Sequence, residues 1–249
     1  MDISAPLFFA VLAPFVGSFA GVVGHRANAP RSILLGRSAC PACRHVLGPF
    51  ELVPLISWVA QRGRCRHCSA AIGVAAPTIE LAAIGIVLWS ASVMSGLWLW
   101  ASCILGWTLL ALAVSDLRHQ LLPDFLTLPL LIAGLAVTAI AAPEAVNSSL
   151  LGAAAGFTVL VLVREAYWLL RAREGIGLGD AKLLAAAGAW IGWEELASTV
   201  TIAAAAAFMS LVIRHFRGEG LSLNDRIPFG AYLCLGFWID WLYGPFGSL

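Results

Sequence analysis

The sequence has few charged residues for its length. Asp, Glu, Lys and Arg make up only 12% of its 249 residues, whereas 60% are hydrophobic. A soluble domain is about half apolar and about a quarter charged, so the composition excludes that class and favours a protein dissolved in lipid. The formal net charge of +1 indicates no partner, and the positions of the charges are more informative than their sum.

Long hydrophobic runs account for most of the chain. About 20 apolar residues are needed to cross the hydrocarbon core of a bilayer, and eight runs meet or approach that length, the sixth and eighth being the shortest. The runs cover residues 5–23, 74–94, 97–114, 125–142, 150–170, 181–193, 196–213 and 228–243. The sequence therefore predicts an all-α polytopic membrane protein with about eight transmembrane helices.

Positive charge is missing before the first run. Asp2 is the only charged residue there, and no Lys or Arg precedes the apolar stretch. A cleavable signal peptide opens with a positively charged region. The first run is therefore expected to stay in the protein as a membrane helix.

Lys and Arg are also missing from every second loop between the runs. All 15 of them fall in or beside the loops that follow the first, third, fifth and seventh runs. Basic residues are retained on the cytoplasmic side of a membrane. The pattern predicts a multi-pass protein with four basic loops in the cytoplasm and both termini on the outer side.

Only one loop is long, covering residues 25–73, and it carries two Cys-x-x-Cys pairs. CPAC supplies Cys40 and Cys43, and CRHC supplies Cys65 and Cys68, with 21 residues between the pairs. Each pair places two thiolates on one tight turn, and two such turns complete a tetrahedron of sulfurs, so the spacing predicts a structural zinc site. Two disulfides are the alternative, which a cytoplasmic location disfavours because thiols stay reduced there.

A closed four-sulfur site leaves no open coordination position, so this zinc would organise the loop and take no part in hydrolysis. The loop also carries basic and apolar residues, Phe50, Ile56 and Trp58 among the latter, which favours contact with the membrane surface. Nucleic acid is not an expected partner, because the topology already accounts for the basic residues. The other two cysteines, Cys103 and Cys234, fall inside apolar runs and are expected to be packing residues.

Two aspartates stand at the ends of apolar runs. Asp116 follows the third run and Asp180 precedes the sixth, and the alternating topology places both on the same face of the bilayer. Ionisable groups at such depth are costly and point to function. Two carboxyl groups close together in a medium of low dielectric share a proton, so one can activate a water while the other protonates a scissile carbonyl. This is the chemistry of an aspartyl protease.

Some residues around these aspartates support the aspartyl protease interpretation, and others favour a purely structural role for the acids. Small residues beside Asp180 would let an extended substrate backbone approach closely, and they are Gly175, Gly177 and Gly179. The alternative assigns the acids to helix caps or to ion pairs with nearby cations such as Lys182. For Asp124, which directly precedes a run, a helix N-cap is the preferred interpretation.

With these motifs the chain resembles the type IV prepilin peptidase family. The members of this family are bacterial membrane aspartyl proteases with a GxGD motif. The matching segments run nearly end to end. They are GSF (17–19), GRSACPAC (36–43), LVPLISW (52–58), RGRCRHC (62–68), DLRHQLLPD (116–124), GLGDAKLLAAAGAWIGW (177–193) and IPFGAYL (227–233).

The resemblance implies a bifunctional enzyme of the bacterial inner membrane. The family removes the short basic leader of type IV prepilins or type II secretion pseudopilins on the cytoplasmic side. It then N-methylates the new amino terminus with S-adenosylmethionine. The family's catalytic aspartates match Asp116 and Asp180, with Gly177, Gly179 and Lys182 beside them. The four cysteines match its zinc loop, which is linked to methylation, and Glu80 matches a glutamate of the same half.

A non-catalytic membrane scaffold with the zinc loop as a docking module is the alternative function. It accounts for the cysteines and the topology but leaves GLGDAKLL without a role. On either interpretation the chain divides into a first transmembrane helix (1–24), a tetracysteine zinc loop (25–73) and a transmembrane core (74–249). The core would hold the protease.

Overall fold

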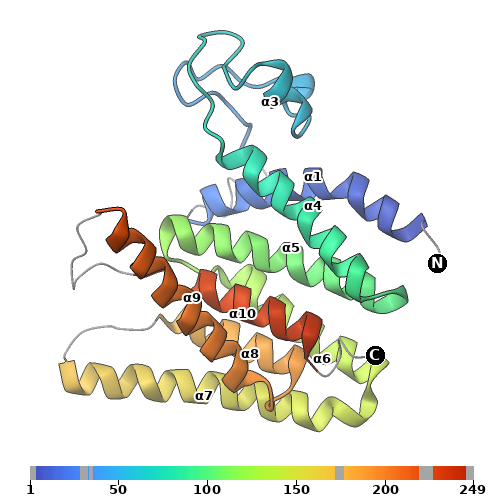
Figure 1. Cartoon of the computed structure of the whole chain (residues 1–249), viewed down its shortest axis with the longest axis vertical. Coiled ribbons are helices and arrows are strands. Elements are labelled where there is room, and N and C mark those ends of the chain that lie inside the picture. The colour runs from blue at the N-terminus through green and yellow to red at the C-terminus, as the bar shows by residue number, and fades with distance from the viewer. Residues whose placement is uncertain (1–3, 29–32, 34–35, 172–176, 219–226, 245–249) are drawn as a thin grey trace. The chain divides into compact units, whose positions relative to one another are not determined.

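The computed structural model describes residues 4–28, 33, 36–171, 177–218 and 227–244. Over these ranges most of the chain is helical, and pairing of extended backbone is limited to two isolated β-bridges. The prediction of an all-α polytopic membrane protein is therefore confirmed. The chain divides into two compact units, Met1–Val114 and Ser115–Leu249, and Figure 1 labels the helices of each.

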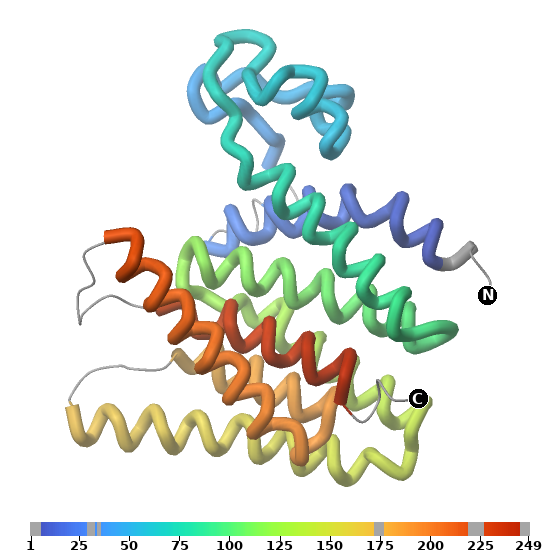
Figure 2. The backbone as a smooth tube through the Cα atoms, viewed as in Figure 1, coloured from blue at the N-terminus to red at the C-terminus, as the bar shows by residue number. Residues whose placement is uncertain are grey.

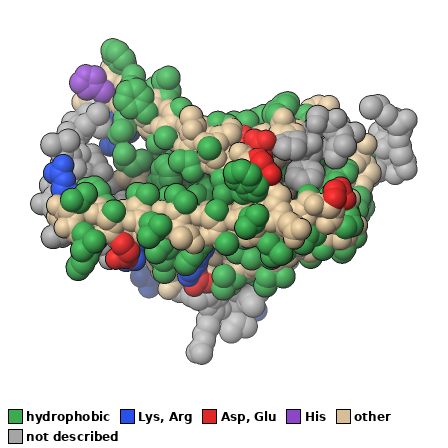
Figure 3. All heavy atoms as spheres, turned by 90° about the horizontal axis from the view of Figure 1, so that it is seen from below, with side chains coloured by type: hydrophobic (Ala, Val, Ile, Leu, Met, Phe, Trp, Pro, Cys, Tyr) green, Lys and Arg blue, Asp and Glu red, His purple; other side chains and the backbone are tan. Residues whose placement is uncertain are grey.

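Six helices of the described chain are long and apolar enough to cross a membrane. They are Pro6–Arg26, Ala75–Val93, Gly96–His119, Asp124–Ala141, Pro143–Arg171 and Leu196–Phe216. The sixth and eighth predicted runs form the shorter helices α8 (Leu178–Ile191) and α10 (Phe229–Tyr243). The face drawn in Figure 3 is covered largely by hydrophobic side chains with scattered charged ones, as a membrane protein requires.

The first unit is built around α1 (Ser4–Arg26), α4 (Ala75–Val93) and most of α5 (Gly96–His119). Its core contains Phe9, Ala13, Ala83, Val87, Leu99, Cys103 and Trp107, so Cys103 is a packing residue as predicted. The helices α1 and α4 approach closely at Gly17, where a Cβ would lie 2.7 Å from Glu80 Cα. Between these two helices the long loop forms two short helical segments, η1 (Pro49–Glu51) and α3 (Ile56–Ala60) (Figure 2).

The second unit surrounds one short helix with longer ones. Its remaining elements are α6 (Asp124–Ala141), η2 (Pro143–Ala145), α7 (Val146–Arg171) and α9 (Leu196–Phe216). The central helix α8 contacts α6, α7, α9 and α10. From Asp180 to Ile191 every residue of α8 except Lys182 is buried, so α8 presents almost no surface to lipid.

Small residues make this enclosure possible. A Cβ at Gly188 would lie 2.2 Å from the backbone of Gly152, and one at Gly156 would lie 2.6 Å from the oxygen of Leu184, so the backbones of α7 and α8 are in contact. On another side of α8, its residue Trp190 donates its Nε1–H to the oxygen of Leu130 in α6 at 2.8 Å. The alanine-rich composition of α8 therefore reflects contact with other helices.

Two helix boundaries differ from the predicted runs in a way that matters for the site. Helix α5 continues past residue 114 to His119, so Asp116 lies within its last turn. The helix ends there because Gln120 takes a positive φ of 52°, which cannot continue a right-handed helix. Helix α8 begins at Leu178, so Asp180 lies in its first turn.

Candidate active site

Asp116 and Asp180 meet beside the first turn of α10. Both are buried, with 5% and 8% of their surfaces exposed. A Cβ at Gly230 would lie 2.9 Å from Asp180 Oδ1 and 3.1 Å from Asp116 Cγ. Both carboxyl groups thus lie within 3.1 Å of a single point, which places them close enough to act on one water molecule.

Each of these carboxyl groups accepts a backbone hydrogen bond at the start of a helix. Ala231, in the first turn of α10, donates its N–H to Asp116 Oδ2 at 2.8 Å. Gly177, the N-cap of α8, donates its N–H to Asp180 Oδ2 at 3.3 Å. The first N–H groups of a helix lack intrahelical partners and carry partial positive charge. Each N–H group therefore stabilises the ionised form of the carboxyl group that it contacts.

Leu122 fills the space between two glycines of the site. A Cβ at Gly179 would lie 3.0 Å from Leu122 Cβ, and one at Gly230 would lie 2.8 Å from Leu122 Cδ1. The turn that carries Leu122 is fixed by Ser115, whose hydroxyl donates to the oxygen of Leu121 at 2.6 Å. The small size of Gly179 thus accommodates Leu122, while Gly175 lies outside the described residues.

Asp124 does not cap α6, so that prediction is wrong. Pro123 is the N-cap, because its extended backbone (φ −71°, ψ 133°) precedes the first helical residue, and no side chain caps the helix. The carboxylate of Asp124 instead accepts a hydrogen bond from Lys182 Nζ at 2.7 Å. An ion pair with Lys182 was the second alternative role that the sequence offered for such an acid. This ion pair links the start of α6 to the start of α8.

Gly230 and the Ala231 N–H belong to the site but were not among the predicted site residues. Their segment IPFGAYL contributes to the sequence analysis only as part of the family resemblance. A usable signal was present, since Pro228 directly precedes the helix and proline is typical of helix starts. A glycine in the first turn after such a proline indicates close approach by another group.

The four cysteines of the long loop converge as predicted. Their sulfur atoms all lie within 4.8 Å of one another, with Cys40 and Cys68 at 3.8 Å and Cys43 and Cys65 at 4.0 Å. Zn–S bonds of about 2.3 Å at tetrahedral angles separate sulfurs by about 3.8 Å, whereas a disulfide joins them at about 2.05 Å. The arrangement suits a metal ion, and these cysteines form no disulfides.

The two cysteine turns have the same backbone construction. In the first, Cys40 donates its N–H to the oxygen of His45 at 2.9 Å, and in the second, Cys65 donates to the oxygen of Ala70 at 2.8 Å. Each turn also closes with an isolated antiparallel bridge, Ala39 with Val46 and Arg64 with Ala71. The backbone therefore presents both cysteine pairs in the same way.

The thiol pKa values of this cluster move in opposite directions. Backbone N–H groups of Cys43 and Ala42 lower the pKa of Cys40 to about 6, and that of Cys68 lowers the pKa of Cys65. At Cys68 the N–H of Ala70 acts in the same direction, but burial and the other sulfurs outweigh it and raise the pKa to about 11. Four thiolates this close repel one another, and a divalent cation would remove that conflict.

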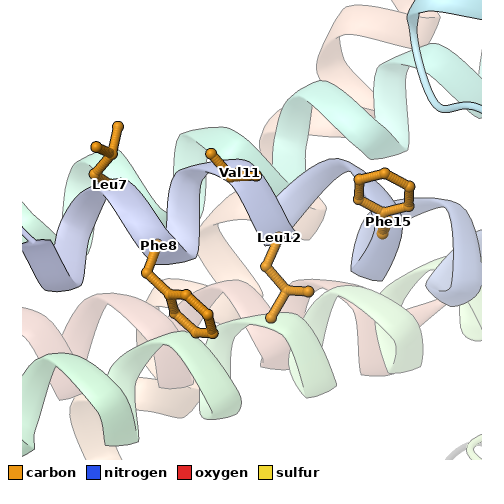
Figure 4. A pocket seen from close by; sticks show the side chains of 5 residues that line it. All are labelled: Leu7, Phe8, Val11, Leu12 and Phe15. Carbon is orange, nitrogen blue, oxygen red and sulfur yellow. The ribbon is translucent and has the colours of Figure 1, made fainter.

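A hollow along α1 is not a candidate active site. It is lined by Leu7, Phe8, Val11, Leu12 and Phe15 (Figure 4). These side chains are apolar and largely exposed, so the hollow has no group that can move a proton or bind a metal. Its composition suits a lipid chain.

Comparison with known proteins gives two family matches that together span most of the chain. Residues 103–213 match the model of the type IV leader peptidase family. Residues 11–94 match the model of the bacterial peptidase A24 N-terminal domain. The first match contains both aspartates, and the second contains the four cysteines.

Several named proteins are similar over nearly the whole length. One from Aeromonas hydrophila is 39% identical over 222 residues, covering 86% of this chain and 74% of that protein. Another from Burkholderia pseudomallei is 39% identical over 256 residues, covering 92% and 82%. A third from Stutzerimonas stutzeri is 36% identical over 275 residues, covering 97% and 93%. Each is named prepilin leader peptidase/N-methyltransferase. No solved structure matches the chain.

Proposed function

The chain belongs to the type IV leader peptidase family, and on that premise we propose that Asp116 and Asp180 are its catalytic residues. It is a membrane aspartyl endopeptidase that removes the basic leader of type IV prepilins or pseudopilins and N-methylates the new amino terminus. The observation that carries the assignment is the convergence of both carboxyl groups on Gly230. A scaffold function gives no reason to bury two acids side by side.

The two aspartates have different roles. The hydrogen bond from Ala231 to Asp116 is 2.8 Å, and that from Gly177 to Asp180 is 3.3 Å. Because the shorter bond stabilises a carboxylate more strongly, Asp116 is the ionised member and Asp180 holds the shared proton. Asp180 Oδ1, which faces Gly230, is the oxygen positioned to donate that proton.

The reaction follows from these roles. Asp116 takes a proton from a water molecule, and the water oxygen attacks the carbonyl carbon of the scissile peptide bond. Asp180 gives its proton to the carbonyl oxygen, so a neutral diol forms at the former carbonyl carbon. The diol then collapses as the C–N bond breaks. The proton held by Asp116 passes to the leaving nitrogen, and a diol hydroxyl returns a proton to Asp180.

The length of α8 supports a recessed position for the pair. A helix of 14 residues is about 21 Å long, whereas the hydrocarbon core is about 30 Å thick. The end that leads to the exposed acid Glu194 belongs at the water surface on one side. The end that carries Asp180 is therefore below the opposite surface, where the leader meets the apolar helix of a pilin.

Methyl transfer is assigned to the first unit. Cys40, Cys43, Cys65 and Cys68 would hold one zinc ion, which would fix the fold of the loop. The methyl donor is S-adenosylmethionine, as the N-methyltransferase name of the relatives implies. Glu80 is the acidic residue of this unit placed beside the loop, because its Oε2 accepts the N–H of Leu55 at 2.8 Å.

We place the protein in the bacterial inner membrane with both termini outside. This orientation puts the zinc loop and the starts of α6, α8 and α10 on the cytoplasmic side, where a basic leader is retained. The aspartate pair and the loop then act on the same side of the membrane. Prepilins or pseudopilins are accordingly its partners, together with lipid.

One experiment tests the proposal as a whole. The purified chain is incubated with a candidate prepilin and S-adenosylmethionine, and both products are analysed by mass spectrometry. Cleavage at the end of the basic leader with a methylated new amino terminus is expected. An intact prepilin would contradict the peptidase assignment, and a cleaved but unmethylated product would restrict the activity to proteolysis.

A further inference from the structure

We propose that the segment of the zinc loop from Pro49 to Ala60 is an anchor that lies in the cytoplasmic leaflet and contacts anionic lipid. This segment comprises η1, α3 and the turn between them, and is called the anchor segment below. It contains none of the zinc-binding cysteines and neither catalytic aspartate. Its role concerns where the loop is held and is independent of the cleavage reaction.

The depth of the anchor segment follows from its contact with α4. Leu55 donates its N–H to Glu80 Oε2 at 2.8 Å, and Glu80 is 5% exposed. Helix α4 has 19 residues, about 28 Å, so nearly all of it is needed to cross about 30 Å of hydrocarbon. Glu80 lies about 7 Å along the helix from its first residue. The anchor segment therefore folds back beside α4 at the depth of the membrane interface.

Apolar side chains of the anchor segment point away from the protein. Phe50 is 87% exposed, Ile56 69% and Val59 67%. Exposed apolar groups at this density are unfavourable in water and mark a surface that contacts lipid or another protein. The same unit buries its own core elsewhere, so these side chains are available to insert among acyl chains.

The charge of the loop indicates that the anchor segment contacts anionic lipid. Residues 36–73 contain five arginines and one acidic residue, Glu51. Arg62, Arg64 and Arg66 directly follow the anchor segment and are exposed. A basic surface beside exposed apolar groups is complementary to an anionic bilayer. It is not complementary to the basic leader of a prepilin, so charge favours lipid over substrate.

Photo-crosslinking of the full chain tests this assignment. Benzoylphenylalanine replaces Phe50 in one variant and Ser69, an exposed polar residue of the second cysteine turn, in the control. Both are reconstituted in nanodiscs containing phosphatidylglycerol, irradiated, and analysed for lipid adducts by mass spectrometry. We expect a several-fold higher adduct yield at position 50 than at position 69, and bound zinc in both variants shows that the loop is folded.

Three outcomes would overturn the proposal. Equal lipid adducts at the two positions would show that Phe50 is not in the membrane. A cross-link from position 50 to added prepilin that displaces the lipid adduct would assign the surface to the substrate. A yield that is unchanged in phosphatidylcholine, or in the triple variant Arg62→Glu, Arg64→Glu, Arg66→Glu, would exclude anionic headgroups. None of these readouts depends on cleavage or methylation.

Discussion

The backbone N–H of Ala231 donates a hydrogen bond to Asp116 Oδ2 at 2.8 Å across the interior of the second unit. The two residues are far apart in sequence and come from α5 and α10. The bond therefore fixes the carboxyl group of one helix against the first turn of another. Gly230, the residue before Ala231, leaves room for Asp180 to join the pair.

Replacing either aspartate with asparagine is expected to abolish most cleavage. Asparagine is close in size but cannot exchange a proton at neutral pH. A general acid or base contributes about 10²–10⁴-fold to rate, so Asp116→Asn and Asp180→Asn should each lose at least that factor. The measurement is the rate of prepilin cleavage in detergent.

Asp124→Asn is the matched control for these variants. Asp124 is exposed on the same side of the unit and forms an ion pair with Lys182, and an exposed ion pair contributes at most about 1 kcal/mol. Cleavage by this variant should stay near the rate of the unchanged protein. Undiminished cleavage by Asp116→Asn or Asp180→Asn would refute the proposed pair.

Gly230→Ala should disable the site without removing a catalytic group. A Cβ there would lie within 3.1 Å of Leu122, Asp180 and Asp116, so the carboxyl groups must separate. We expect a large loss of cleavage with little change in membrane insertion.

Gly85→Ala is the control for this glycine, because a Cβ at Gly85 meets nothing within 4 Å. Alanine is favoured over glycine inside a helix by about 1 kcal/mol, so this variant should be fully active and slightly more stable. Equal activity of the two alanine variants would show that the carboxyl groups do not need the space beside Gly230.

Cys40→Ser should release zinc and impair methylation more than cleavage. The sulfur of Cys40 lies 3.8 Å from that of Cys68. Removing the Cys40 sulfur leaves only three sulfur ligands for the metal. Zinc content by elemental analysis and methylation by mass spectrometry are the measurements. Cys103→Ala, which changes a cysteine of the helical core, should keep its zinc; loss of zinc from that variant alone would place the metal elsewhere.

Acid should remove the zinc. Zinc binds thiolates, and the lowered pKa of Cys40, about 6, keeps this ligand ionised at neutral pH. A group whose folded pKa is lowered contributes stability that is present at high pH and lost as the pH falls through that value. Zinc should therefore be retained at neutral pH and released in acid as the thiolates become protonated, measured with a chromogenic chelator. Release beginning above neutral pH would contradict the role of Cys40.

The sequence predicted those features that depend on hydrophobic length and on motif spacing. Each apolar run became a helix, including the short ones at α8 and α10, because a backbone surrounded by lipid or by other helices must satisfy its hydrogen bonds internally. The four cysteines met because each pair is fixed on a turn by local backbone bonds. Loop charge placed Asp116 and Asp180 on one face, which was sufficient to nominate them.

Contacts between distant segments were not predictable in the same way. Nothing in the local sequence of Leu55 indicates that its N–H bonds to Glu80. The glycine at 230 indicates a close approach but does not identify the two carboxyl groups beside it. The N-cap assigned to Asp124 was wrong because an N-cap rule considers only neighbours along the chain, whereas Lys182 reaches this acid from another helix.

Because α8 is enclosed by other helices, the cleavage rate should not depend on the thickness of the host bilayer. Hydrophobic mismatch acts on helices that touch lipid, which respond by tilting, and in this unit those are the longer helices around α8. Asp180 is instead carried by a helix whose neighbours are protein on nearly every side. The enzyme should accordingly keep its cleavage rate in nanodiscs of short-chain and long-chain lipids alike, a tolerance that a lipid-facing catalytic helix would lack.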